Sequence, residues 1–269
     1  MSKPQLLIDT DPGVDDALAI LMAHAHADIA GLSIAAGNVG LDHTVRNART
    51  LVVESHFDYH QQALLYVPQE LPDPRSPAFT SAAAREIIEI LTHSRGRAFV
   101  LFTSYQQMRL IYDKVSLEVP YQTLLQGSGP RSALLEEFRT TRNAVLFATS
   151  SFWQGVDVQG EQLSCVIIDR LPFAVPSDPV VAARVKAIDA EGGNAFFDYQ
   201  VPAAVITLKQ GFGRLIRSLH DRGLLVLLDN RILKKQYGRV FVESLPRYKR
   251  TTDMKVVEEF FGVGSGTKS

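Results

Sequence analysis

Short apolar runs alternate with longer segments of helical periodicity along most of this chain. Apolar runs bounded by turn-forming residues predict eight strands, at Gln5–Ile8, Ile29–Ala36, Ala63–Val67, Ala98–Phe102, Tyr121–Leu125, Ala144–Ala148, Leu163–Asp169 and Leu224–Asp229. Helical spacing of apolar residues predicts helices between them, at Ala17–Ala27, His43–Val53, Phe79–His93, Gln106–Val115, Leu134–Arg139, Val180–Ala190 and Pro202–Leu219. This alternation predicts an α/β fold with a parallel sheet and flanking helices, whose ligands bind beyond the carboxyl ends of the strands.

The first 53 residues predict a short βαβα segment that cannot bury both faces of a parallel layer alone. The pattern changes from Phe57, where a proline-rich loop and a longer series of strands and helices begin. We therefore expect three parts: the segment 1–53, a larger domain at 54–261, and a flexible tail at 262–269.

The net charge of −1 hides an uneven distribution of charged residues. From residue 201 onward the sequence has 13 Lys and Arg against 6 Asp and Glu. A basic terminal quarter is compatible with a face that binds a polyanion, and equally with an ordinary solvated surface.

Cys165 is the single cysteine and lies within the apolar run LSCVIID. This apolar context predicts that Cys165 is a small buried residue, and a single cysteine permits neither a disulfide nor a cysteine-ligated cluster. Asp9 and Asp11 interrupt any secretory signal, and no apolar stretch reaches the ~18 residues of a membrane span. We expect a cytoplasmic protein without a membrane partner.

Four carboxylates fall within the segment LLIDTDPGVDD at residues 6–16. Asp9, Asp11, Asp15 and Asp16 repel one another unless a cation or hydrogen-bond donors neutralise them. Such oxygen ligands suit Ca²⁺, Mg²⁺ or the hydroxyls of a sugar. Acidic residues at a helix N-terminus are the alternative, although they account only for Asp15 or Asp16.

Residues 6–50, from LLIDTDPGVDD to AAGNVGLDHTVRNART, resemble the opening of the inosine-uridine nucleoside hydrolases. The resemblance implies that Asp11 and Asp16 bind Ca²⁺ and that Asp15 and Asn38 hold the ribose hydroxyls. It ends near Val53, and the turn supplies too few of the about 6–8 oxygens that Ca²⁺ needs. We therefore expect an incomplete site and no nucleoside hydrolysis.

Gln210, Arg214 and Arg217 are spaced four and three residues apart, so one continuous helix would present them on one face. Two arginines so placed can bind phosphate oxygens in a bidentate manner. Surface arginines at a helix C-terminus are the alternative. At another strand end, Thr103 and Ser104 can donate hydroxyl and backbone N–H bonds to a phosphate of DNA.

Six segments, in order, resemble the second motor domain of DinG/XPD-like superfamily 2 DNA helicases, which has a RecA-like sheet. They are FDYHQQALLYVPQELPDP, FVLFTSYQQM, SSFWQGVDVQG, DRLPFAVPSDP, QGFGRLIRS and LLDNRILKKQYG. The resemblance spans residues 57–261. It implies three groups of functional residues: catalytic arginine fingers at Arg214 and Arg217 with Gln210, a nucleotide contact at Gly155 and Asp157, and a DNA track at Thr103, Ser104, Ser151 and Trp153. Trp153 could stack on a base or fill the core.

The sequence has no GxxxxGK[ST] loop to cradle phosphates and no acidic box of the DEAH type to hold Mg²⁺. We expect ATP and Mg²⁺ to be shared with a first motor domain in trans, weak binding of single-stranded DNA, and no iron–sulfur cluster. Three functions follow as hypotheses: a helicase motor domain that is inactive alone, a Ca²⁺-dependent nucleoside hydrolase, and a non-catalytic nucleic-acid-binding fragment.

Overall fold

The computed structural model describes residues 5–10, 28–34, 57–149, 152, 162–175, 177–213, 215–216 and 221–262. The chain divides into two compact units, Met1–His56 and Phe57–Ser269. In the first unit, β1 (Gln5–Thr10) and β2 (Asp28–Ile34) pair in parallel, with a register shift between Leu6 and Leu7. The two predicted strands are confirmed, whereas both helices predicted in this unit lie outside the described residues.

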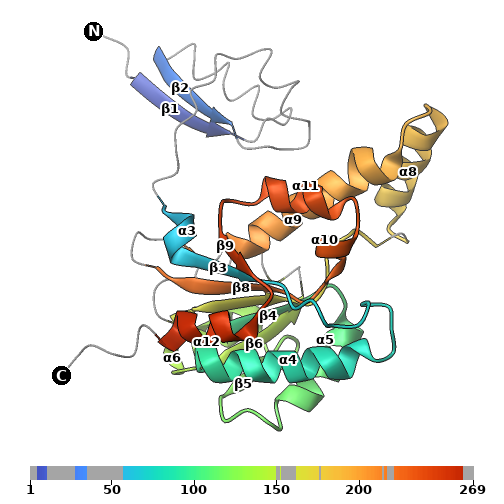
Figure 1. Cartoon of the computed structure of the whole chain (residues 1–269). Coiled ribbons are helices and arrows are strands. Elements are labelled where there is room, and N and C mark those ends of the chain that lie inside the picture. The colour runs from blue at the N-terminus through green and yellow to red at the C-terminus, as the bar shows by residue number, and fades with distance from the viewer. Residues whose placement is uncertain are drawn as a thin grey trace. The chain divides into compact units, whose positions relative to one another are not determined.

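The second unit is built on one seven-stranded parallel sheet (Figure 1). The strand order is β5-β6-β4-β7-β8-β3-β9, with bounds β3 (Ala63–Tyr66), β4 (Ala98–Phe102), β5 (Thr123–Leu125), β6 (Val145–Thr149), β7 (Cys165–Ile168), β8 (Gly223–Leu227) and β9 (Lys249–Thr251). The predicted parallel α/β fold is therefore confirmed. Because every strand runs the same way, all the carboxyl ends meet at one edge, called here the carboxyl edge, and the opposite edge is the amino edge.

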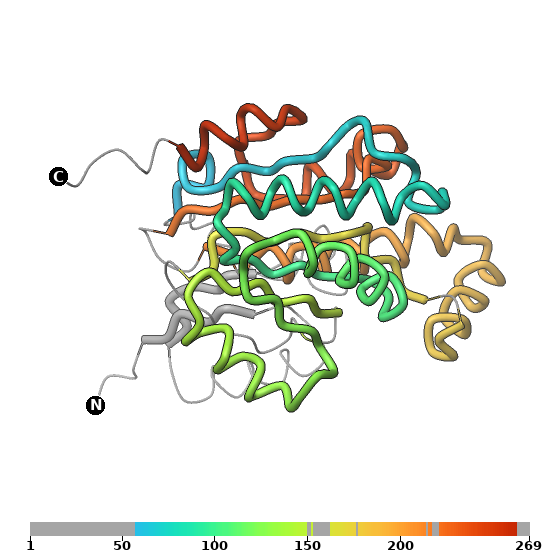
Figure 2. Tube along the Cα trace, turned by 90° about the horizontal axis from the view of Figure 1, so that it is seen from below, coloured from blue at the N-terminus to red at the C-terminus, as the bar shows by residue number. Residues whose placement is uncertain are grey.

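Helices cover both faces of this sheet (Figure 2). One face carries α4 (Phe79–Ser94), α5 (Tyr105–Val115) and α12 (Met254–Gly262), and the other carries α6 (Arg131–Thr140), α9 (Val201–Phe212), α10 (Arg231–Lys234) and α11 (Gly238–Ser244). Three further elements are α3 (Tyr59–Gln62), α8 (Pro179–Ala190) and the π-helix η2 (Phe196–Gln200).

The central strands are apolar at nearly every position because both of their faces are buried. In β3, Leu64 and Tyr66 pack with α4, while Leu65 packs with the helices of the other face. Phe138 of α6 is 1% exposed and Phe79 of α4 is fully buried. These rings anchor one helix to each face, and truncating such a ring to alanine typically costs about 3–5 kcal/mol.

Helix α9 ends at Phe212, although the sequence predicts a helix that continues to Leu219. The N–H of Gly213 donates to the carbonyl of Lys209, and Leu215 closes a turn on Phe212. A β-carbon at Gly213 would lie only 3.1 Å from the carbonyl oxygen of Lys209. The prediction of one continuous helix through Gln210 to Leu219 is therefore wrong, because α9 ends at Phe212.

Candidate functional site

The turn after β4 lies at the carboxyl edge and carries Thr103 and Ser104. The backbone N–H of Thr103 donates to Oδ1 of Asp169 over 3.0 Å. The hydroxyl of Ser104 caps α5, accepting a 3.4 Å hydrogen bond from the N–H of Gln107. The N–H of Thr103 is thus engaged inside the protein, which leaves the half-buried hydroxyls of both residues for a phosphate contact.

Asp169 follows β7 and has a fully buried side chain. Burial raises the pKa of this carboxyl group to about 7, although the N–H of Thr103 and the charge of Arg170 both act to lower it. Its Oδ2 lies 3.7 Å from Nε of Arg170, and neither atom has a hydrogen-bond partner in the described part of the chain. The guanidinium of Arg170 instead lies over the ring of Phe79, 5.0 Å from its centroid.

Asp229 follows β8 and is also fully buried. Nε and Nη2 of Arg231 donate to its two carboxylate oxygens over 2.8 and 2.6 Å, and the N–H of Leu171 donates over 2.9 Å. Asp229 and Arg231 thus form a bidentate ion pair whose carboxylate is buried. Asn230 donates to the carbonyl of Leu71, so the ends of β7, β8 and β3 are tied together at the carboxyl edge.

A second polar cluster links the ends of β5 and β6. The N–H and hydroxyl of Thr149 donate to Oε1 of Gln126 over 2.6 and 3.1 Å, and the amide of Gln126 donates to the hydroxyl of Tyr105. Tyr105 begins α5 and is 53% exposed. Sequence reasoning missed Gln126, Tyr105 and Asp169, and the polar side chain directly after each buried strand was the signal available for Asp169.

In the loop after β6, Phe152 is the one described residue between positions 150 and 161. Its side chain is buried, the guanidinium of Arg131 lies 5.3 Å from its ring centroid, and Nη2 of Arg131 donates to its carbonyl over 3.3 Å. Four predicted site residues of this loop lie outside the described residues: Ser151, Trp153, Gly155 and Asp157.

The end of α9 lies at the amino edge, because this helix returns the chain to the start of β8 (Figure 1). The side chain of Leu215 packs on Gly223, the first residue of β8, where a β-carbon would lie 2.6 Å from Leu215 Cδ1. Gln210 is exposed on the last turn of α9. Arg214 and Arg217 lie outside the described residues.

Two kinds of feature, metal-ligating clusters and membrane-spanning helices, are absent from the described residues. They contain no group of three His, Cys, Asp or Glu side chains that could hold a metal ion. Within the same ranges, no helix has the length and apolarity needed to cross a membrane. Cys165 is buried, as predicted. The N-terminal candidates Asp11, Asp15, Asp16 and Asn38 lie outside the described residues.

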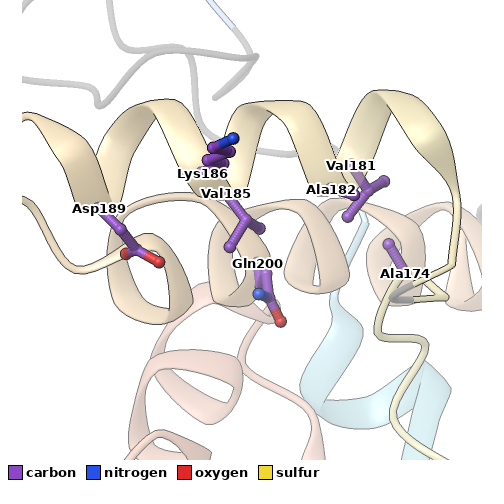
Figure 3. Close-up of a pocket in the computed structure, with 7 residues that line it drawn as sticks. All are labelled: Ala174, Val181, Ala182, Val185, Lys186, Asp189 and Gln200. Atoms are coloured by element: carbon purple, nitrogen blue, oxygen red, sulfur yellow. The ribbon is translucent and has the colours of Figure 1, made fainter.

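A pocket of about 400 Å³ lies between α8 and η2, away from the residues predicted to act (Figure 3). Val181 and Val185 line it together with Asp189 and Lys186, all from α8, and Gln200 comes from η2. Its walls are mostly small and aliphatic, and none of the predicted site residues contributes to it.

The model of the helicase C-terminal domain family matches residues 87–248, which is more than half of the chain. The chain belongs to this family. A second model, that of the inosine-uridine preferring nucleoside hydrolases, matches residues 6–94. This match continues beyond Val53, where sequence reasoning ended the resemblance, and includes β3 and α4, which are packed into the helicase unit.

Curated relatives are ATP-dependent DNA helicases of the YoaA and DinG types. The chain is 43% identical to YoaA of Haemophilus influenzae over 216 residues, covering 80% of this chain and 34% of that protein. It is also 43% identical to YoaA of Escherichia coli, covering 82% and 35%, and 39% identical to DinG of Mycobacterium tuberculosis, covering 76% and 31%. The chain therefore spans about a third of the length of these relatives.

Solved structures of XPD helicases share this fold. An XPD helicase covers 86% of this chain and 44% of its own, with a TM-score of 0.56 and 16% identity. Xpd4 of S. tokodaii covers 88% and 48%, with a TM-score of 0.54 and 17% identity. At this identity the likeness concerns the fold, and it supports the RecA-like sheet predicted from sequence.

Proposed function

We propose that the unit beginning at Phe57 is the second motor domain of a DinG-type ATP-dependent DNA helicase, and that the chain alone does not hydrolyse ATP. The family match and the helicase relatives support the domain type. The lack of a GxxxxGK[ST] loop in these 269 residues supports inactivity, because the phosphates of ATP then have no cradle.

We assign the nucleotide side of this domain to Arg214 and Arg217 as fingers, together with Gln210, Gly155 and Asp157. Such arginines stabilise charge on a transferring phosphoryl group and are worth roughly 10³–10⁵ in rate. They act on a nucleotide that another motor domain holds. Mg²⁺ and ATP are then ligands of that other domain.

The DNA side comprises Thr103, Ser104, Ser151 and Trp153. The hydroxyls of Thr103 and Ser104 stand at the first turn of α5, where the partial positive charge of a helix N-terminus favours a phosphate. Asp169 holds Thr103 through its N–H, which fixes the backbone of the turn while the hydroxyl stays available.

The separation of the two predicted groups carries this proposal. Gln210 lies in the last turn of α9 at the amino edge, whereas Thr103 and Ser104 lie at the carboxyl edge. A translocating motor needs distinct nucleotide and DNA contacts, and the positions of Gln210 and of the Thr103–Ser104 turn at opposite edges of the sheet support two such contacts in this unit.

A chimera tests the proposal. Residues 57–262 would replace the matching third of E. coli YoaA, and DNA-stimulated ATP hydrolysis would be measured. We expect hydrolysis in the chimera, its loss in Arg217→Ala, and none in the 269-residue chain. A chimera that folds and binds DNA without hydrolysing ATP, or turnover by the chain alone, would contradict the proposal.

The nucleoside hydrolase match leads to a second candidate function. Asp11 and Asp16 would bind Ca²⁺, and Asp15 and Asn38 would bind ribose. We propose that this site is incomplete, because a single turn offers too few of the about 6–8 oxygens that Ca²⁺ requires. If both activities are absent, the chain is a nucleic-acid-binding fragment without turnover.

A further inference from the structure

A pocket of about 750 Å³ opens between the α10–α11 segment and the sheet edge formed by β3 and β9. The aliphatic lining of this groove, called here the floor, consists of Leu65, Val67, Ile232, Val242 and the partly exposed Leu233. Its position follows from the chain path, since α10 begins directly after β8 at the carboxyl edge and β9 is the last strand of the sheet. None of the residues assigned above to nucleotide or DNA lines this groove.

The rim of the groove is cationic. Lys235, Arg239 and Arg250 line it, together with the hydroxyl-bearing Thr251 and Thr252. These cations come from three different segments: the end of α10, α11 and β9. Residues 231–252 contain seven Lys and Arg and a single acidic residue, Glu243. Of these, Lys235, Arg239 and Arg250 line the groove, and none of the described acidic residues does.

The three cations differ in whether an acidic side chain neutralises them. Arg239 donates to Glu243 over 2.6 Å, so its charge is already compensated. Lys235 and Arg250 are exposed, and the described part of the chain gives neither an acidic partner within ion-pair distance. Two uncompensated cations beside threonine hydroxyls are suited to phosphate oxygens.

The floor of the groove decides which polyanion fits. None of its lining residues is aromatic, so bases have no ring on which to stack. Contact must then run through the sugar–phosphate backbone, without base preference. The groove and the Thr103–Ser104 turn share the carboxyl edge, and β3 lies three strand intervals from β4, or about 14 Å at ~4.8 Å each. One oligonucleotide can span that distance.

We propose that the groove of Lys235 and Arg250 is a second binding site for the phosphate backbone of the single strand that contacts Thr103 and Ser104. The inference rests on the DNA-binding half of the proposed function. It extends the track from β4 across β7 and β8 to β3 and β9, and it assigns a role to the basic terminal quarter. An acidic peptide shares the same charge complementarity, and the experiment separates the two ligands.

The experiment titrates a long and a short fluorescent oligothymidine into the 269-residue chain at two salt concentrations. The test variant is Lys235→Ala/Arg250→Ala, and the control, Lys114→Ala/Lys255→Ala, removes the same charge from the exposed surfaces of α5 and α12. We expect the test variant to weaken binding of the long oligonucleotide several-fold and to reduce the salt slope by about 1.4, at ~0.7 per phosphate. The same substitutions should weaken binding of the short oligonucleotide less, and the control variant should bind both oligonucleotides as wild type does.

Other outcomes overturn the inference in distinguishable ways. If the test and control variants bind DNA equally well, the groove does not contact DNA, and the proposed contact at Thr103 and Ser104 is unaffected. If wild type binds no oligothymidine at low salt, the DNA half of the proposed function fails together with the inference. If the test variant keeps DNA binding but loses a glutamate- and leucine-containing peptide that wild type binds, the groove is a peptide site. Unchanged circular dichroism of the variants verifies folding.

Discussion

The backbone N–H of Thr103 donates a 3.0 Å hydrogen bond to the buried carboxyl group of Asp169. This bond joins the ends of two adjacent strands, β4 and β7, and fixes the turn from which α5 starts. A group proposed to contact DNA is therefore positioned by a carboxyl group that never meets solvent. Both the stability and the binding chemistry of this edge depend on Asp169.

The stability of the second unit should depend on pH through Asp169. Burial raises its pKa from 3.8 to about 7. Between these values the folded protein keeps a proton that the unfolded chain has lost, so this group's contribution to stability falls as pH rises and levels off above about 7. The slope expected from one group is about −1.4 kcal/mol per pH unit.

Denaturant unfolding between pH 4 and 8 measures this slope. Asp169→Asn keeps an acceptor for the N–H of Thr103 but cannot ionise, so the stability of this variant should decline less with pH than that of wild type. Parallel curves for the two proteins would show that Asp169 does not titrate with a raised pKa.

The buried ion pair at the carboxyl edge should contribute strongly to folding. Arg231→Ala leaves the carboxylate of Asp229 buried with only backbone N–H donors, which should reduce the free energy of unfolding by about 3 kcal/mol. Arg239→Ala breaks an exposed pair with Glu243 and is the matched control, with little change expected. Urea unfolding of both variants tests the difference, and equal losses would contradict it.

The thiol of Cys165 should be unreactive in the folded protein. It lies on β7 with no exposed surface, and burial raises its pKa, so little reactive thiolate forms. A thiol reagent at pH 8 should label wild type only as fast as the chain unfolds, and labelling should accelerate with added denaturant. Rapid labelling without denaturant would mean that β7 opens locally.

The sequence predicts most of the sheet because its central strands are continuously apolar. Ala98–Phe102 is predicted with the bounds that β4 has, so Thr103 is correctly expected directly after the end of a strand. The elements that were missed, such as β9 (Lys249–Thr251) and α10 (Arg231–Lys234), are short and rich in cations. They take their conformation from pairing and packing partners far away in sequence, which a local pattern cannot reveal.

Sequence reasoning chose the candidate site residues by their type and could not supply their geometry. The predicted helix extended beyond the end of α9 because apolar residues continue at helical spacing past Gly213, where the backbone turns. The role of Asp169 could not be read from sequence, since its partner Thr103 lies 66 residues earlier. The position of Gln210 at the amino edge likewise follows from the connection of α9 to β8, which only the topology gives.

Nucleoside hydrolysis by the chain should be absent, and Ca²⁺ binding should be weak. Asp11 and Asp16 offer carboxylate oxygens from one turn, too few for the about 6–8 that Ca²⁺ requires. Calorimetric titration with Ca²⁺ and an inosine hydrolysis assay test this expectation. A micromolar affinity that Asp16→Ala abolishes, with inosine turnover, would establish a complete site.

The central claim is that DNA contacts the Thr103–Ser104 turn and that Arg214 and Arg217 serve the nucleotide instead, and single-stranded DNA binding tests it most directly. Ser104→Asp keeps a side chain that can cap α5 but places a negative charge beside the phosphate, whereas Ser104→Asn caps without charge. Titration of a fluorescent oligothymidine at two salt concentrations should give weak wild-type binding with a log–log slope on the order of −2 to −3. Ser104→Asp should abolish this binding, while Ser104→Asn and the double variant Arg214→Ala/Arg217→Ala should retain it. Loss of binding in the arginine double variant, together with retention in Ser104→Asp, would contradict the account.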